Sequence, residues 1–175
     1  MSRNLTPEFG SGIILHPKLS SANTGRPLLM GILNLTPDSF YQGSRLTKNG
    51  AIKQAENMIQ SGADWIDIGG ESTRPGATPI SIEEELERVI PVVNNLRKKY
   101  PNLLISVDTR NHEVARQAIA SGANMINDVS GLRDQKMLDL VVDSKCAVCI
   151  MHMLGEPGNM QKQPKYHNVV DEVIT

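Results

Sequence analysis

The stretch SGADWID at residues 61–67 recurs, with few changes, as SGANMIND at residues 121–128. In each copy we expect a helix to end at Ser-Gly and an apolar strand to follow, ending in Asp or Asn. Helix-to-strand units that recur along a chain are typical of a parallel sheet whose strands are joined by helices. The repeat therefore predicts an α/β fold.

Outward from the repeat, apolar runs alternate with helical patterns. We expect strands near residues 28–34, 64–68, 103–108, 124–128 and 147–152, and helices near 48–61, 82–99, 111–121, 135–144 and from about 168 onward. Ser81 followed by Glu84 predicts a capping box at the second helix. Asn111 and Asp134 are the expected N-caps of the third and fourth helices, because their side-chain oxygens can accept hydrogen bonds from backbone N–H groups.

The predicted strands end in polar side chains. Side chains alternate between the two faces of a strand, so Asn34 shares a face with Ile32 while Leu33 lies on the other. The same rule applies to the next strands, and the four residues expected at the strand ends are Asn34, Asp67, Asp108 and Asn127. Parallel α/β folds bind ligands at the carboxyl ends of their strands, so these groups predict the floor of a small-molecule site.

Two α/β architectures fit this order of elements. The first is a (β/α)8 TIM barrel, of which the chain would hold about the first five β/α units. A closed barrel typically takes ~250 residues, whereas this chain has 175. The second is an open, doubly wound sheet of five strands. Gly69-Gly70 does not begin a G-x-G-x-x-G motif, which disfavours dinucleotide binding in that second fold.

Composition excludes several classes of partner. A net charge of -1 provides no basic field, so we expect neither nucleic acid nor an anionic membrane as a general partner. No apolar run approaches the ~20 residues of a transmembrane helix, and the N-terminus lacks a signal-peptide core. These features favour a cytoplasmic protein. We expect residues 1–27 to form an irregular leader and turn region, and residues 28–175 to form one barrel domain that is incomplete at its C-terminal end.

Cys146 and Cys149 form a C-x-x-C sequence, which can indicate a redox or zinc site. Residues three apart on a strand face opposite sides, however, and no second Cys/His pair accompanies these two. We therefore expect ordinary cysteines.

Five motifs together resemble one family. MGILNLTPDSF (30–40), DIGGESTRPGA (67–77), ISVDT (105–109), INDVSG (126–131) and CIMHM (149–153) are similar to the motifs of the dihydropteroate synthases, which are built on a (β/α)8 barrel. The resemblance implies condensation of p-aminobenzoate with 6-hydroxymethyl-7,8-dihydropterin diphosphate, giving 7,8-dihydropteroate and pyrophosphate. It also implies a dissociative reaction assisted by Mg²⁺, with no protein nucleophile. A homodimer is one option, because the family is often dimeric.

The resemblance also assigns roles to individual residues. Asp108 and Asn127 would grip the pterin and act in catalysis, with Val129 and Met151 as apolar surface against the ring. Thr73 would contact the diphosphate. Asn34 would hold Mg²⁺, for which oxygen ligands are suitable. The p-aminobenzoate pocket would consist of Phe40, Arg74 and Pro75.

Each assignment has a structural alternative. Asp108 could cap a helix, since N-caps favour Asp. Asn127 could be a buried amide satisfied by neighbouring strands, and Arg74 an ordinary surface cation. Asp67 and Asp128 are open between contact with a ligand and structural pairing, because buried carboxylates need partners in either case.

Two departures from the family pattern leave other functions open. Tyr41-Gln42-Gly43 stands where the family has Ser-Asp-Gly, so the acidic group on the arylamine side becomes an amide. The family's last three barrel strands have no counterpart in these 175 residues. Two further hypotheses are a non-catalytic pterin-binding relic or fragment, and a methyltetrahydrofolate-type pterin-binding methyltransferase. The TPDSF and ESTRPG motifs disfavour the methyltransferase.

Overall fold

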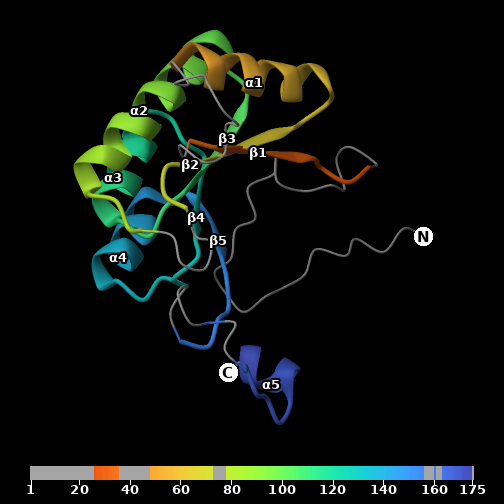
Figure 1. The fold of residues 1–175 in the computed structure, drawn as a ribbon, viewed down its shortest axis with the longest axis vertical. Helices are drawn as coiled ribbons and strands as arrows, with labels where there is room; N and C mark the ends of the chain where they lie inside the picture. Colours follow the sequence, from red (N-terminus) through yellow and green to blue (C-terminus); the bar gives the residue numbers. More distant parts are fainter. Residues whose placement is uncertain (1–25, 36–47, 73–77, 156–159, 161–162, 175) are drawn as a thin grey trace.

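The structure is a computed structural model that describes residues 26–35, 48–72, 78–155, 160 and 163–174. In this described part of the chain, five strands alternate with five helices (Figure 1). The strands are β1 (Met30–Asn34), β2 (Trp65–Gly69), β3 (Leu104–Asp108), β4 (Met125–Asp128) and β5 (Ala147–Ile150). The helices are α1 (Lys48–Gln60), α2 (Ile82–Lys99), α3 (His112–Ala120), α4 (Gln135–Ser144) and α5 (Val169–Ile174).

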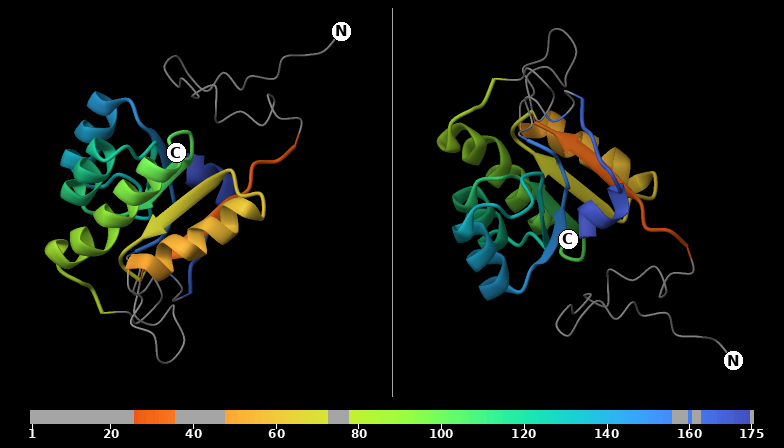
Figure 2. Two further views of the ribbon diagram at one scale, coloured as in Figure 1. Left: turned by 90° about the horizontal axis from the view of Figure 1, so that it is seen from above. Right: turned by 90° about the horizontal axis from the view of Figure 1, so that it is seen from below.

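The strands form one parallel sheet in the order β1-β2-β3-β4-β5. Helices α1 to α4 lie together on one side of this sheet, as the two views of Figure 2 show. A doubly wound sheet would reverse its strand order and carry helices on both faces. Sequential order with helices on one side is the arrangement of consecutive units of a (β/α) barrel. The barrel prediction is confirmed and the open-sheet alternative is wrong.

The core lies between the sheet and these helices. On the helix-facing side of the strands, apolar side chains are completely buried: Leu33, Ile66, Ile68, Ile105, Val107 and Ile126. They pack with buried apolar residues of the helices, among them Val89, Val93, Leu96, Ala115 and Met137. Burying one such aliphatic side chain contributes ~1.5–3 kcal/mol. Because alternate strand residues fill this core, the intervening residues must face the other way, toward the site.

The Ser-Gly repeat is a repeat of helix endings. Gly62 and Gly122 have φ of +101° and +97°, a left-handed conformation that glycine adopts without the clash of a Cβ atom. The following amides, of Ala63 and Ala123, donate back to the carbonyls of Met58 and Ala118 at 3.0 and 2.9 Å. Both endings turn the chain sharply from helix into strand, which confirms the prediction made from residues 61–67 and 121–128.

The helix starts confirm the prediction fully for Asp134, in part for Ser81, and not for the side chain of Asn111. The Ser81 hydroxyl accepts from the Glu84 amide at 3.2 Å, although the Glu84 carboxylate pairs with Arg88 and does not complete the capping box. Asp134 accepts from the amide of Lys136 at 3.0 Å, as expected. Asn111 occupies the N-cap position of α3, but its side chain makes no capping bond. That part of the prediction is wrong, because the Asn111 amide donates instead to the buried carboxylate of Glu85.

The two edges of the sheet are less well covered than its centre. Ile32 of β1 is 61% exposed and Ile150 of β5 is 58% exposed. No residue of α5 within the described range is buried, and Figure 1 shows this helix apart from α1 to α4. Within the described residues, no helix is long and apolar enough to cross a membrane. The predicted leader falls almost entirely outside the described residues.

Candidate functional site

One row of side chains crosses the carboxyl end of the sheet. Paired positions run Asn34–Gly69–Asp108–Asn127–Cys149 from β1 to β5. Residues paired in a parallel sheet point to the same face, and this face is opposite the helix-covered core. Asn34, Asp108 and Asn127 are therefore brought together as predicted.

Gly69 leaves a bare stretch of backbone in the middle of this row. A Cβ atom built on Gly69 would lie 3.4 Å from Oδ1 of Asn34, and 3.7 Å from Oδ2 of Asp108. The amide oxygen and the carboxylate thus flank the same small space. Any side chain at position 69 would fill part of the room that a ligand needs between them.

Asp67 lies one layer deeper than expected. Strand β2 continues to Gly69, so Asp67 pairs with Ser106 below the row of strand ends. Asp67 is 5% exposed and Ser106 is fully buried. Nδ2 of Asn127 donates to Oδ2 of Asp67 at 3.1 Å. Oδ1 of Asp67 and Oγ of Ser106 are buried and have no hydrogen-bond partner among the described residues.

Asp108 has a strongly perturbed environment. Burial, and then the negative charge of Asp67 followed by smaller effects of further carboxylates, raise the pKa of Asp108 to about 7. A carboxyl group so poised can be neutral or charged near neutral pH, and such groups concentrate at functional sites. Because α3 has Asn111 at its N-cap position, the alternative that Asp108 caps this helix is wrong.

Asp128 is a structural residue. It is completely buried on the helix-facing side of the sheet. Its Oδ1 accepts from the amide and hydroxyl of Ser130 at 2.7 and 2.6 Å, and its Oδ2 accepts from the amide of Leu132 at 2.9 Å. These bonds fold the turn after β4, so the open question about Asp128 is settled in favour of structural pairing.

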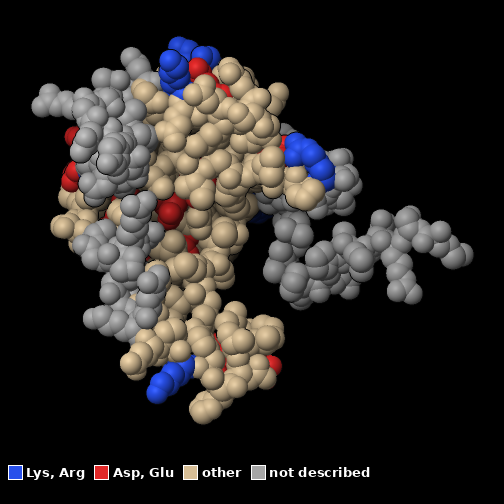
Figure 3. Space-filling model, turned by 45° about the vertical axis from the view of Figure 1, so that its right-hand side comes forward, with Lys and Arg blue, Asp and Glu red and all other residues tan. Residues whose placement is uncertain are grey.

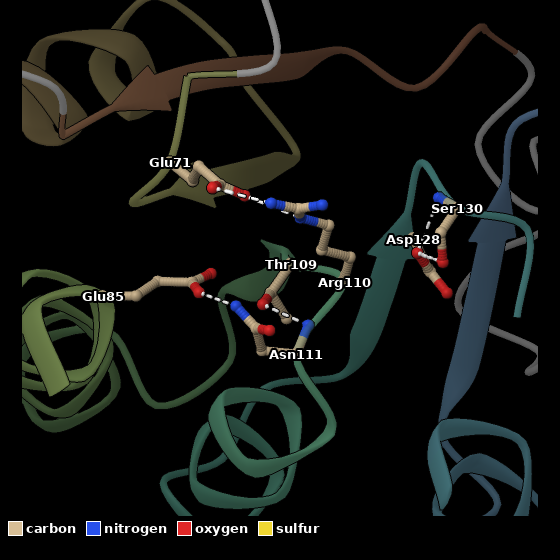
Figure 4. A network of polar contacts seen from close by, with 7 residues as sticks. All are labelled: Glu71, Glu85, Thr109, Arg110, Asn111, Asp128 and Ser130. Carbon is tan, nitrogen blue, oxygen red and sulfur yellow. Dashed lines mark hydrogen bonds and ion pairs between the residues drawn. The ribbon is translucent and has the colours of Figure 1, made fainter. Parts of the chain in front are cut away.

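Two further contacts hold the rim of the site (Figure 4). Arg110 donates from Nε and Nη2 to the two oxygens of Glu71, at 2.9 and 3.0 Å, joining the segments after β2 and β3. Bidentate pairs of this kind are directional. Behind them Glu85 of α2 accepts from Asn111, and burial raises the pKa of this carboxyl.

No local sequence pattern indicates these rim residues. Glu71 and Arg110 are 39 positions apart, and Glu85 stands in a first turn where acidic residues are common. Only the pairing of β2 with β3 brings them together.

The remaining predicted residues divide into two groups. Val129 is buried and Met151 partly buried, and each lies one residue beyond the end of its strand, β4 or β5. Phe40, Gln42, Thr73, Arg74 and Pro75 lie outside the described residues. Cys146 and Cys149 form no disulfide.

Charged side chains are distributed unevenly over the surface near the site. Figure 3 shows some Asp and Glu side chains in the middle of one face, with no Lys or Arg beside them there, and others at the edges of the view. Carboxylates set back from solvent favour a ligand that presents hydrogen-bond donors.

Comparison with known proteins identifies relatives along most of the chain. Residues 30–175 match the family described as pterin binding enzyme. The dihydropteroate synthase of Escherichia coli (strain K12) is 47% identical over 157 residues, which cover 88% of this chain and 55% of that protein.

Solved structures agree. A Yersinia pestis dihydropteroate synthase in complex with a sulfonamide drug matches with a TM-score of 0.79 and 42% identity, over 86% of this chain and 55% of that one. A Xanthomonas albilineans dihydropteroate synthase with 4-aminobenzoic acid matches with a TM-score of 0.74 and 48% identity, over 85% and 52%. The chain spans about half the length of these three proteins.

Proposed function

This chain belongs to the pterin binding enzyme family, and from that premise we propose that it is part of a dihydropteroate synthase. The reaction would join p-aminobenzoate to 6-hydroxymethyl-7,8-dihydropterin diphosphate, giving 7,8-dihydropteroate and pyrophosphate. The described residues would supply the floor for the pterin, and the reaction would proceed by departure of diphosphate before attack of the arylamine.

The observation that carries the proposal is the adjacent pair Asp108 and Asn127, with Asp67 bonded behind Asn127. A pterin presents an edge of N–H donors. An ionised carboxylate is an acceptor only, and an amide oxygen is a further acceptor. The pair therefore matches that edge by charge-assisted hydrogen bonds, which are stronger than bonds between neutral groups.

Negative charge at Asp108 would also assist the chemistry. When diphosphate leaves, the pterin methylene carbon becomes electron-deficient, and a fixed negative charge nearby stabilises the positive charge that develops. The partly buried position of Asp108 supports this role, because electrostatic interactions are stronger where water is largely excluded. No protein nucleophile is required, since the attacking group is the amine of the second substrate.

Mg²⁺ is the proposed cofactor, and Asn34 the residue that would hold it. Among the described residues no group of three His, Cys, Asp or Glu side chains could bind a metal ion. The amide oxygen of Asn34, which lies beside the backbone of Gly69, could serve as a single protein ligand to Mg²⁺. Mg²⁺ usually keeps several waters and phosphate oxygens and takes only one or two ligands from the protein. When bound, it would neutralise charge on the departing diphosphate.

The other substrate contacts are proposals from family resemblance. Thr73 would contact the diphosphate, while Phe40, Arg74 and Pro75 would enclose p-aminobenzoate. Val129 and Met151 would pack against the pterin ring. A relative with 4-aminobenzoic acid bound supports this class of second substrate.

The test combines a binding and a turnover measurement on the natural protein. Trp65 is the single tryptophan of these 175 residues. It is 3% exposed and two residues before Asp67 on β2, so its fluorescence should report a pterin in the site. We expect saturable quenching by 6-hydroxymethylpterin, and pyrophosphate release that requires the dihydropterin diphosphate, p-aminobenzoate and Mg²⁺ together. Quenching without release would favour the non-catalytic relic, and absence of both would refute the proposal.

A further inference from the structure

We infer that Asp67 is a positioning residue that fixes the amide of Asn127 and so makes the site select a pteridine with a 2-amino group over one with a 2-carbonyl group. The inference deepens the proposed function and rests on it. Asp67 acts through Asn127, which is the residue that would meet the ligand.

The bond between the two residues determines which way the amide faces. An ionised carboxylate can only accept hydrogen bonds. The group of Asn127 that lies 3.1 Å from Oδ2 of Asp67 must therefore be its NH₂. The reverse orientation would set two acceptor oxygens against each other. The carbonyl oxygen of Asn127 is thus turned away from Asp67.

The position of Asp67 gives that bond its rigidity. Strand β2 is paired on both sides, with β1 and β3. The neighbours of Asp67 along the strand, Ile66 and Ile68, are completely buried in the core. The backbone therefore cannot shift to let Asp67 find another partner, and the carboxylate is 5% exposed to solvent.

The same layer has an unmet demand for donors. Oδ1 of Asp67 and Oγ of Ser106 are buried without a partner among the described residues, at paired positions of β2 and β3. The Ser106 hydroxyl can donate as well as accept, so the carboxylate oxygen is the atom that requires a donor. A buried charged oxygen without a hydrogen bond is costly. The site is therefore matched to a ligand that brings N–H groups, and mismatched to one that brings a carbonyl oxygen to the same place.

Two commercial pteridines differ in the relevant group. Pterin carries an amino group at position 2 of the ring, whereas lumazine carries a carbonyl oxygen there. With Asn127 presenting its oxygen, pterin can donate to it and lumazine would place two acceptors together. We expect the unsubstituted protein to bind pterin at least about tenfold more tightly than lumazine, the equivalent of one hydrogen bond.

The decisive variant is Asp67→Asn, which keeps the shape of the side chain and removes its charge. An amide at position 67 can donate as well as accept, so Asn127 becomes free to turn and present its NH₂ group. Pterin affinity should fall and lumazine affinity should rise, so that the ratio of the two dissociation constants shifts by about tenfold or more. Quenching of Trp65 measures both affinities.

Two more variants sharpen the test. Asp67→Ser removes the carboxylate altogether and should bring the ratio close to one, which provides a second measurement if Asp67→Asn folds poorly. Asp64→Asn is the matched control, because Asp64 lies just before β2 at its opposite end, where it pairs with Arg26. This control should leave the ratio unchanged.

The outcomes separate the inference from the proposed function. A shift of the ratio in Asp67→Asn supports the inference. Equal weakening of both ligands, or an unchanged ratio, overturns it and assigns Asp67 a merely structural role, while pterin binding by the unsubstituted protein would still stand. A shift of the pterin-to-lumazine ratio without pyrophosphate release would support the inference and refute the proposed synthase activity. If the unsubstituted protein binds neither pteridine, both fall.

Discussion

Replacing Asp108 by Asn should stabilise the protein at alkaline pH. Burial and neighbouring carboxylates raise the pKa of Asp108 from 3.8 to about 7. An acid with a raised pKa in the folded state retains its proton there when the unfolded chain has already released it. Its favourable contribution is complete below pH ~4 and is lost as the pH rises through ~7. At pH 8 the protein therefore carries the full cost of this carboxylate.

The magnitude follows from the shift. A change from 3.8 to about 7 is close to three units, and at ~1.4 kcal/mol per unit it sets a ceiling of about 4 kcal/mol. Asp108 is partly exposed, and solvent screening reduces such energies, so we expect about 2 kcal/mol. For a chain of this size that corresponds to roughly 4–8 °C in the unfolding midpoint.

The assay compares thermal unfolding of the unsubstituted protein and Asp108→Asn at pH 4.5 and pH 8, followed by circular dichroism. The variant should be more stable at pH 8, with most of the gain absent at pH 4.5. Asp143→Asn, at an exposed carboxylate of α4, serves as the control and should not reproduce the difference. A variant that is equally or less stable at both pH values would show that Asp108 has partners that satisfy its charge, and the reasoning would be refuted.

Three further outcomes are expected. Pterin affinity should rise with pH between about 6 and 8, because only the ionised form of Asp108 accepts hydrogen bonds with both oxygens. An affinity that does not change with pH in fluorescence titrations would contradict this. A double-mutant cycle on Glu71 and Arg110, measured by urea unfolding, should give a coupling energy of about 1 kcal/mol or more. The more exposed pair Glu113–Arg116 should give about 0.5 kcal/mol or less. Equal coupling energies would show that the rim pair has no special role. Gly69→Ala should weaken binding of the pterin diphosphate severalfold with little change in unfolding midpoint, because the alanine methyl group would enter the space between Asn34 and Asp108. An unchanged affinity would show that the ligand binds elsewhere.

The faces of the strands could be predicted because they depend on period two alone. Each strand has buried aliphatic side chains on one face, as in Ile66 and Ile68, so the remaining side chains necessarily shared the other face. The helix ends at Gly62 and Gly122 were equally accessible to prediction, since the left-handed conformation they adopt strongly favours glycine. Local rules therefore account for the fold and for the grouping of Asn34, Asp108 and Asn127.

The depth of a side chain within the site and its long-range hydrogen-bond partners were less predictable from the sequence. Asp67 was expected at a strand end, but β2 runs two residues further because Gly69 pairs with both neighbouring strands. Asn111 was expected to cap α3, and a buried carboxylate 26 positions away takes its amide instead. For Asn111 a tertiary contact overrides a local capping preference that is worth only ~1 kcal/mol.

The layered arrangement explains why so much negative charge can persist beside an apolar core. The negative charge of Asp67 adds to the electrostatic cost of ionising Asp108. The folded protein tolerates this cost because Ile66, Ile68, Ile105 and Val107 on the reverse face of the same strands are fully buried. A ligand with a donor edge would satisfy the acceptors of both layers at once. Binding strength and selectivity would thus come from the same unpaired oxygens that lower the stability of the free protein, and removing them should increase stability only at the expense of recognition.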